Sequence, residues 1–261
     1  MRTGRPARVP SDLPILQLQR VDDGAIFLLR PASRDATTFT STIQSGLPDG
    51  TYRVTIISDG VSSVSSVVTI RTIPLVGPTS LNAAAASATS VNVTWAAVNG
   101  ASTYEIIRSE DHINYVSRGT VAGTRLPDSA LSGKAYLYKV HAFDALGSLG
   151  PDSLPDLPTT VIFDNDPVVA GRTPARAVHI TQLRTAVDAV RTLAGLTGGS
   201  YAEAITAGTT IKASHILELR SALDPARSAL GLMALSYTDP SLTGGFLIKA
   251  AHINELRSGV K

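Results

Sequence analysis

The sequence of 261 residues contains no cysteine, which excludes disulfide bonds, thiolate metal sites and cysteine nucleophiles. Aromatic residues are also scarce, at 5%, and charged residues reach only 17%. This composition is unusual for an enzyme with a deep pocket and is common in extended bacterial surface proteins. The length allows two domains, or three small ones that each bury a modest core.

The chain also lacks a strong charge of either sign and a long apolar run. A net charge of +2 gives no electrostatic argument for nucleic acid, which requires Lys and Arg massed on one face. No segment approaches the roughly 20 apolar residues of a membrane span. We expect residues 1–10 to form a flexible basic arm, and because no apolar stretch follows them they do not have the pattern of an intact signal peptide. We expect a secreted or cell-surface protein whose signal peptide is not in this chain.

The motifs of common catalytic sites are missing as well. The sequence has no Gly-x-Ser-x-Gly elbow, no phosphate-binding glycine loop and no His-Glu-x-x-His. The carboxylates are scattered, with no pair that can be placed in one cleft. We therefore expect no catalytic residue and no cofactor.

Residues 11–74 are predicted to form a small or incomplete immunoglobulin-like β-domain. Strand candidates are short and separated by turns, at 15–19, 25–29, 37–43, 51–57 and 64–71. Tyr52 follows a Pro-Asp-Gly turn in a Gly-x-Tyr-x-Val pattern, which resembles the corner where a tyrosine hydroxyl ties a loop to the next strand. A sandwich with so few strands leaves a sheet edge open, and an open edge invites a partner strand.

A proline-punctuated hinge at 73–78 leads into a second β-domain, residues 75–163. Apolar residues alternate at 90–95, at 100–109 and at 136–142, which gives each strand one buried face. These segments carry Trp95, Tyr104, Tyr136 and Tyr138 in an order that resembles a fibronectin type III domain. The resemblance implies a seven-stranded sandwich around the lone tryptophan, with Tyr52, Trp95, Tyr104, Tyr136 and Tyr138 in the cores of the two β-domains.

The last hundred residues repeat one element three times. It reads AVHITQLR at 177–184, ASHILELR at 213–220 and AAHINELR at 250–257, so the histidines lie 36 and then 37 residues apart. A fixed period of this size predicts stacked helical repeats. We place the α-helical repeat domain at 164–261, with repeats near 172–208, 209–245 and 246–261. The repeated residues assigned to its structure are His179, Leu183, Arg184, His215, Leu219, Arg220, His252, Leu256 and Arg257, with Tyr201 and Tyr237 from the connecting segments.

Details of the repeats follow from local signals. Thr173 and Pro174 are typical of a helix N-cap and first turn, and Pro225 is expected to kink the second helix or start another. Each connecting segment is expected to hold one short helical turn pinned by a buried tyrosine, at 201–205 and 237–242. Because the third copy stops after one helix, we expect its apolar face to be open, so that it must be capped, dimerised or continued.

The polar residues of the repeats leave alternatives open. The histidines are better explained by hydrogen bonds to a loop carbonyl or to a neighbouring tyrosine or aspartate than by a shared metal ion, because equivalent positions in stacked repeats lie about 10 Å apart. Arg184 and Arg220 have i,i+4 partners in Asp188 and Asp224, with pairing to Glu218 and Glu255 as the alternative. The arginines form a row that offers a lesser alternative, an anionic glycan or lipid. Asp164, Asn165 and Asp166 are a weak calcium signal.

The repeated element, with its Tyr-Thr-Asp-Pro companion at 237–240, is similar to repeats in large exported bacterial proteins that carry immunoglobulin-like or fibronectin modules. The predicted fold is multidomain, β then α: two immunoglobulin-like β-sandwiches followed by an all-α helical repeat domain. The predicted function is non-enzymatic, as a structural or adhesive spacer or a self-assembling surface or fibre subunit. Its expected partners are copies of itself or other surface-protein modules. The alternatives are glycan- or surface-binding accessory modules of an exported hydrolase and, last, an enzyme with an unrecognised site.

Overall fold

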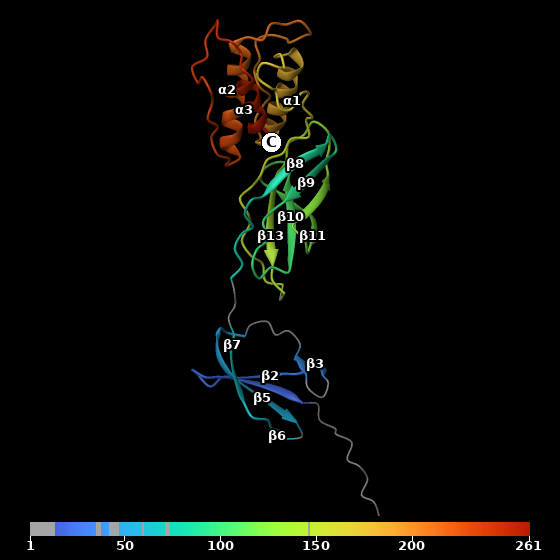
Figure 1. Cartoon of the computed structure of the whole chain (residues 1–261), viewed down its shortest axis with the longest axis vertical. Coiled ribbons are helices and arrows are strands. Elements are labelled where there is room, and N and C mark those ends of the chain that lie inside the picture. Colours follow the sequence, from blue (N-terminus) through green and yellow to red (C-terminus); the bar gives the residue numbers. More distant parts are fainter. Residues whose placement is uncertain (1–13, 35–37, 42–46, 59, 71–73, 146) are drawn as a thin grey trace, which may run out of the picture. The chain divides into compact units, whose positions relative to one another are not determined.

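The structure, a computed structural model, describes residues 14–34, 38–41, 47–58, 60–70, 74–145 and 147–261. It divides into two compact units, one up to Pro74 and one from Leu75 to the end. The basic arm at 1–10 and the first residue of the hinge, Ile73, lie outside the described residues. Figure 1 shows both units.

The first unit is built on one five-stranded antiparallel sheet. Its strands are β1 (Ile15–Arg20), β2 (Ile26–Leu29), β5 (Gly50–Ser58), β6 (Val61–Ser62) and β7 (Ser66–Ile70), in the order β2-β1-β5 with β6 and β7 both on the far side of β5. A separate hairpin joins β3 (Pro31–Arg34) to β4 (Phe39–Ser41). The strand expected at 37–43 is thus seen as β4, and its ends lie outside the described residues.

The core of the first unit is small. Among the described residues only Leu18, Leu29 and Tyr52 are buried hydrophobics there. Leu18 lies opposite Phe27 on β2 and opposite Val54 on β5, which places alternate residues of three strands on one face. The Tyr52 hydroxyl donates to the Pro48 carbonyl at 2.6 Å, the contact that the Gly-x-Tyr pattern predicts. This hydrogen bond ties the turn before β5 to the core.

The second unit begins with two three-stranded sheets packed face to face. One has the order β12-β9-β8, with β8 (Asn82–Ser87), β9 (Ser90–Thr94) and β12 (Arg125–Ser129); the other has the order β11-β10-β13, with β10 (Thr103–Ser109), β11 (Tyr115–Val121) and β13 (Leu137–Phe143). In place of a regular seventh strand, the segment after β13 makes isolated bridges such as Tyr138 to Asp156. The core between the sheets contains Val91, Val93, Trp95, Tyr104, Ile106, Tyr136, Tyr138, Val140 and Ala142.

Three helices complete the second unit: α1 (Ala177–Leu193), α2 (Ala213–Ala229) and α3 (Ala250–Gly259). Each helix contacts the other two. Figure 1 shows the three helices together at one end of the sandwich. Helix α1 has Arg176 as its N-cap, so the expected start at Thr173 and Pro174 is wrong. Helix α2 runs through Pro225 as a single element, so no second helix starts there. None of the described helices is long and apolar enough to cross a membrane.

The connecting segments differ from expectation. Residues 201–205 and 237–242 form bends and turns rather than a helical turn, and Tyr201 and Tyr237 are half-buried rather than fully buried. These connections span 19 residues between α1 and α2 and 20 residues between α2 and α3. Loops of this length need tertiary contacts to stay ordered, because they carry little secondary structure of their own.

The sandwich and the helices of the second unit share one hydrophobic core. Ala135, Leu137 and Leu157 of the sandwich belong to the same buried cluster as the inward faces of the three helices. On the same boundary, His112 Nδ1 lies 2.9 Å from the carbonyl oxygen of Leu193 at the end of α1. The C-terminal end of α1 therefore rests on the sandwich, and the unit behaves as one body.

Tyrosine-to-phenylalanine substitutions test the two corners separately. Tyr136 accepts a hydrogen bond from the Leu131 amide at 2.8 Å, in the same type of corner that Tyr52 makes with Pro48. We expect Tyr52→Phe to lower the free energy of unfolding of the first unit, and Tyr136→Phe that of the second, by about 1 kcal/mol each, because each leaves one buried polar group unpaired. Urea unfolding followed by residue-specific NMR signals measures both transitions. Equal shifts of both transitions by either variant would contradict the division into two units.

Candidate functional site

The three repeated histidines occupy equivalent positions, one per helix. His179, His215 and His252 are completely buried. Each Nδ1 accepts the backbone N–H of the residue that caps its helix, from Arg176 at 3.3 Å, Lys212 at 3.1 Å and Lys249 at 3.2 Å. A nitrogen that accepts a backbone N–H carries no proton, so in the neutral ring the proton is on Nε2. The imidazole, at the third position of its helix, thus accepts the N–H of the N-cap residue, as a Glu or Gln at that position does in a capping box.

The Nε2 atoms face the loop that precedes each helix. His252 Nε2 lies 3.0 Å from Asp239 Oδ2 and His179 Nε2 lies 3.3 Å from Asn165 Oδ1. His215 Nε2 is 3.7 Å from Glu203 Oε2, too far for a hydrogen bond. The prediction that these Nε2 atoms bind a loop carbonyl is therefore wrong. The predicted alternative, an aspartate, is the partner of His252. No group of three or more potential metal ligands occurs in the parts of the chain that the structure describes.

Charges beside the histidines shift several pKa values. Burial, reinforced by the nearby positive charge of Arg257, lowers the pKa of His179. A hydrogen bond from Lys212 lowers the pKa of Glu203, and one from Lys249 lowers that of Asp239. The lowered pKa values keep these two loop carboxylates ionised beside the buried rings of His215 and His252.

The repeated arginines hold the loop that follows each helix. Arg184 donates to the carbonyl of Glu203 at 2.7 Å, and Arg220 donates to those of Thr238 at 2.8 Å and Asp239 at 3.0 Å. Each guanidinium also stacks over a tyrosine ring, Arg184 over Tyr201 and Arg220 over Tyr237, at 4.4 Å. Arg220 is buried and Arg184 is mostly covered, so these side chains do not form an exposed anion-binding row.

The arginines pair between helices and not along one helix. Arg184 lies 3.2 Å from Glu218 and Arg220 lies 3.6 Å from Glu255. The i,i+4 salt bridges to Asp188 and Asp224 are therefore wrong, and the alternative pairing is the one observed. The two aspartates instead accept hydrogen bonds from the hydroxyls of Tyr201 at 3.1 Å and Tyr237 at 2.5 Å.

Arg257, the last of the three, binds the segment that precedes α1. It donates to the carbonyls of Asp164 at 2.7 Å and Asn165 at 2.8 Å, and it stacks over Phe163 at 4.9 Å. Asn254 exchanges two further hydrogen bonds with the backbone of Val168, at 3.0 Å and 2.9 Å. We call residues 163–168 the clasp.

The clasp covers the end of the helical domain that was expected to be open. Ile253, Leu256 and Val260 of the third copy have no exposed surface, so that expectation is wrong. The backbone of Asp164 also donates to Gln182 of α1 at 2.9 Å, as Ala202 donates to Glu218 and Thr238 to Glu255. Each of the three connecting segments is thus hydrogen-bonded to an arginine of one helix and to a Gln or Glu of another helix. Because the arginine of α3 binds the segment that precedes α1, the arrangement is closed.

Sequence reasoning missed the clasp although a signal was present. Phe163 lies 16 residues before His179, close to the spacing of 14 and 15 residues by which Tyr201 and Tyr237 precede the next histidines. Asp166, part of the weak calcium signal, faces two cations instead: it lies 3.6 Å from Arg257 and pairs with Lys261. The remaining repeated residues, Leu183, Leu219 and Leu256, are fully buried in the shared core.

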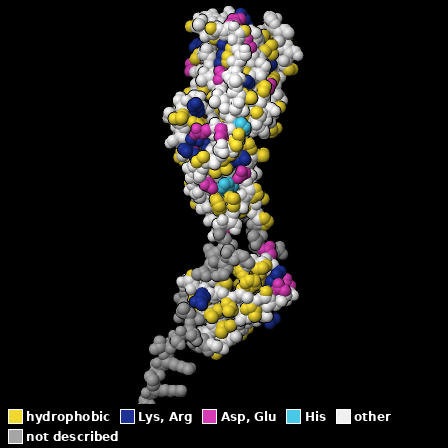
Figure 2. All heavy atoms as spheres, turned by 180° about the vertical axis from the view of Figure 1, so that it is seen from behind, with side chains coloured by type: hydrophobic (Ala, Val, Ile, Leu, Met, Phe, Trp, Pro, Cys, Tyr) yellow, Lys and Arg dark blue, Asp and Glu magenta, His cyan; other side chains and the backbone are white. Residues whose placement is uncertain are grey.

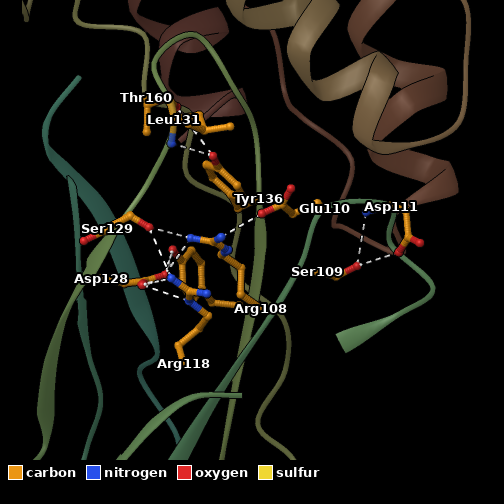
Figure 3. A network of polar contacts seen from close by, with 11 residues as sticks. Arg108, Ser109, Glu110, Asp111, Arg118, Asp128, Ser129, Leu131, Tyr136 and Thr160 are labelled. Carbon is orange, nitrogen blue, oxygen red and sulfur yellow. Dashed lines mark hydrogen bonds and ion pairs between the residues drawn. The ribbon is translucent and has the colours of Figure 1, made fainter. Parts of the chain in front are cut away.

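A second polar cluster, also missed by sequence reasoning, joins the two sheets of the sandwich (Figure 3). Asp128 of β12 accepts hydrogen bonds from Arg108 at 2.8 Å and from Arg118 at 2.9 Å, and its third donor is the Tyr138 hydroxyl at 2.7 Å. Burial, with the adjacent Asp128 carboxylate, raises the pKa of Tyr138. The cluster is internally satisfied and connects β10, β11 and β13 to the opposite sheet.

Comparisons with solved structures find β-domains of related type over part of the chain. A Fn3-like protein from Clostridium thermocellum is 27% identical over 33% of this chain and 94% of its own, with a TM-score of 0.32. The FN1-FN3 domains of chicken CNTN1 are 17% identical over 56% of this chain, with a TM-score of 0.33, and a multidomain segment of titin is 20% identical over 57%, with a TM-score of 0.35. This chain spans 55% of each of those two structures. No protein family and no curated protein matches the sequence.

Removal of the Arg257 side chain tests the clasp. We expect Arg257→Ala to lower the free energy of unfolding of the second unit by about 3 kcal/mol or more, because it leaves the carbonyls of Asp164 and Asn165 and the charge of Asp166 without their buried partner. Lys261→Ala is the matched control: it removes the more exposed cation beside Asp166 and should cost less than about 1 kcal/mol. Chemical denaturation measures both. Equal effects of the two variants would show that the clasp does not depend on Arg257.

Acidification tests the neutral state of the buried histidine. Since the pKa of His179 is lower in the folded chain than its ordinary value of 6.5, the unfolded chain binds the proton more tightly. Stability of the second unit should therefore fall as the pH drops through 6.5 and level off below the folded pKa. Denaturation midpoints from pH 8 to pH 5 measure this effect. Glu203 and Asp239 do not interfere in this range, because their lowered pKa values place their titration at lower pH. A midpoint that is constant or rises on acidification would contradict it.

Proposed function

We propose that this chain is a non-enzymatic structural or adhesive module that acts in a secreted or cell-surface protein and associates with copies of itself. One observation carries the proposal: the polar clusters of the second unit are engaged in contacts within the chain. His252, Arg257 and Asp128, for example, each bind groups from another segment of the chain. Polar groups that bind one another within the chain hold its parts together and are not available to bind a substrate.

The second unit has the properties of a rigid spacer. Its sandwich and helices share one core, and the boundary between them is further fixed by His112. The clasp closes the helical part, so growth by stacking further copies onto α3 is not the route of association. The repeats support the proposal as a closed, stiff element rather than as an extendable rod.

The first unit has the properties of an association module. Its core is small, and large apolar side chains are exposed along and beside β7: Val61 (71%), Val64 (95%) and Val67 (68%). Figure 2 shows hydrophobic side chains gathered on the visible face of this unit. Exposed apolar surface of this kind marks contact sites for other proteins.

Glycan binding, the alternative, has little support in the surface. Among the described aromatic residues only Phe246 is exposed. Carbohydrate-binding faces commonly present several aromatic rings, so a glycan array is expected to show no specific ligand. Specific binding there would favour the accessory-module alternative over the structural one.

Sedimentation and electron microscopy of the purified chain test self-association. We expect dimers or larger assemblies to accumulate with rising concentration and to persist in 1 M salt, because apolar contacts are not screened by ions. A strictly monomeric particle up to several hundred micromolar would overturn the self-associating form of the proposal. Assemblies that dissolve in salt would instead indicate pairing between surface charges.

A further inference from the structure

We propose that two copies of this chain pair edge to edge through β7 of the first unit, which extends the five-stranded sheet across a two-fold axis. The inference rests on the proposed self-association and names the surface responsible. Strand β7 pairs with β5 on one side, and no other described strand pairs with its second side. Among the described residues that second side has no hydrogen-bond partner, so its backbone N–H and C=O groups are offered to another strand.

Other sheet edges among the described residues carry protective features that β7 lacks. In β8, the Ala83 amide is taken by the Asp156 carboxylate at 2.6 Å. β11 carries Arg118 at an irregularity in the β10–β11 pairing, and β12 contains Pro127. Charges, prolines and bulges are the common means by which proteins prevent unwanted edge pairing.

Of the remaining edges, β13 is covered by backbone hydrogen bonds from Ser153 and Asp156, and the others are short: β3 has four residues and contains Pro31, and β6 has two. β2 has four residues and is followed directly by Arg30 and Pro31. β4 has three residues. Short strands offer few backbone hydrogen bonds to a partner. β7 is thus the least protected edge in the described parts of the chain.

The β7 edge itself is suited to pairing. Residues 60–70 contain no charged residue and no proline, and β7 consists of Ser66, Val67, Val68, Thr69 and Ile70, four of them exposed. Val and Ile, which branch at Cβ, and Thr favour the extended conformation. Val61 and Val64, just before β7, are 71% and 95% exposed, so the apolar surface continues along the edge.

A second copy of this chain fits this edge better than a charged partner does. The edge has no charge to attract a basic or acidic strand, and for the same reason it meets no like-charge repulsion when it pairs with itself. An antiparallel pair with its axis at Val68 sets Val67 opposite Thr69 of the other copy and Ser66 opposite Ile70. Such a pair is isologous and closed, the commonest form of homodimer.

Charge-swap variants test the proposal. In the proposed register, a Val67→Lys/Thr69→Lys chain sets lysines directly opposite each other, and a Val67→Glu/Thr69→Glu chain does the same with glutamates. We expect each variant alone to dimerise at least about tenfold more weakly than the parent chain, and a mixture of the two to recover dimers. Recovery in the mixture shows that both variants are folded. Leu28→Lys, on the opposite edge at similar exposure, is the control and should change the dissociation constant less than about twofold.

Cross-linking gives a second, independent measurement. Because the chain has no cysteine, Val68→Cys and Leu28→Cys each introduce a single thiol. We expect mild oxidation to link Val68→Cys chains into dimers and to leave Leu28→Cys chains largely monomeric. A parent chain that dimerises, with no weakening in the lysine variant and no preference for position 68, would overturn the β7 proposal and leave self-association intact. A parent chain that stays monomeric would overturn both.

Discussion

The second unit depends on buried arginines that hold the backbone of long loops. A planar guanidinium has five N–H donors, so one side chain can satisfy two successive carbonyls and stack on an aromatic ring at once. Arg220 and Arg257 do both, and Arg184 combines one carbonyl with the ring and with Glu218. Without them, connections of 19 and 20 residues would have to leave carbonyls unpaired beside the core, which is costly. The loops are therefore as much a part of the fold as the helices are.

The histidines complement the arginines at the other end of each loop. A helix N-terminus prefers acidic or small polar residues, yet the caps here are Arg176, Lys212 and Lys249, with no acidic residue in the first turn. The neutral imidazole accepts the cap amide, and in two copies the loop carboxylate pairs with the cap lysine. Each helix start is thus joined to the preceding loop by charge and to its own backbone by the ring. These hydrogen bonds are a structural reason for histidine to recur at this position.

The sequence allowed several features to be predicted because they depend on short-range patterns. Alternation located β5, β9, β10 and β13, and the tyrosine patterns identified the hydrogen bond of Tyr52. The period of the histidines located all three helices. The features that the sequence did not reveal depend on contacts between residues far apart in the sequence. Arg257 donates to the carbonyl of Asp164, 93 residues away, and Arg108 donates to Asp128 on the other sheet. The predicted start of α1 was wrong for a different reason. Thr173 and Pro174 carry a strong local signal for a helix start, but the N-cap is Arg176, whose N–H is accepted by the buried His179 three residues inside the helix.

Closure of the helical domain changes where association can occur. In an open stack the last repeat presents a large apolar face, and that face would dominate any contact with another copy. Here Phe163 and its neighbours supply the missing third segment, so the same residues that end the sandwich also complete the helices. The second unit thereby covers the apolar face of its last helix within the chain. The three-residue core of the first unit leaves apolar side chains exposed on its sheet, and its β7 edge has neither charge nor proline to oppose a partner strand. The closed helical part supports the spacing role proposed for the second unit, and the open β7 edge supports the contact role proposed for the first.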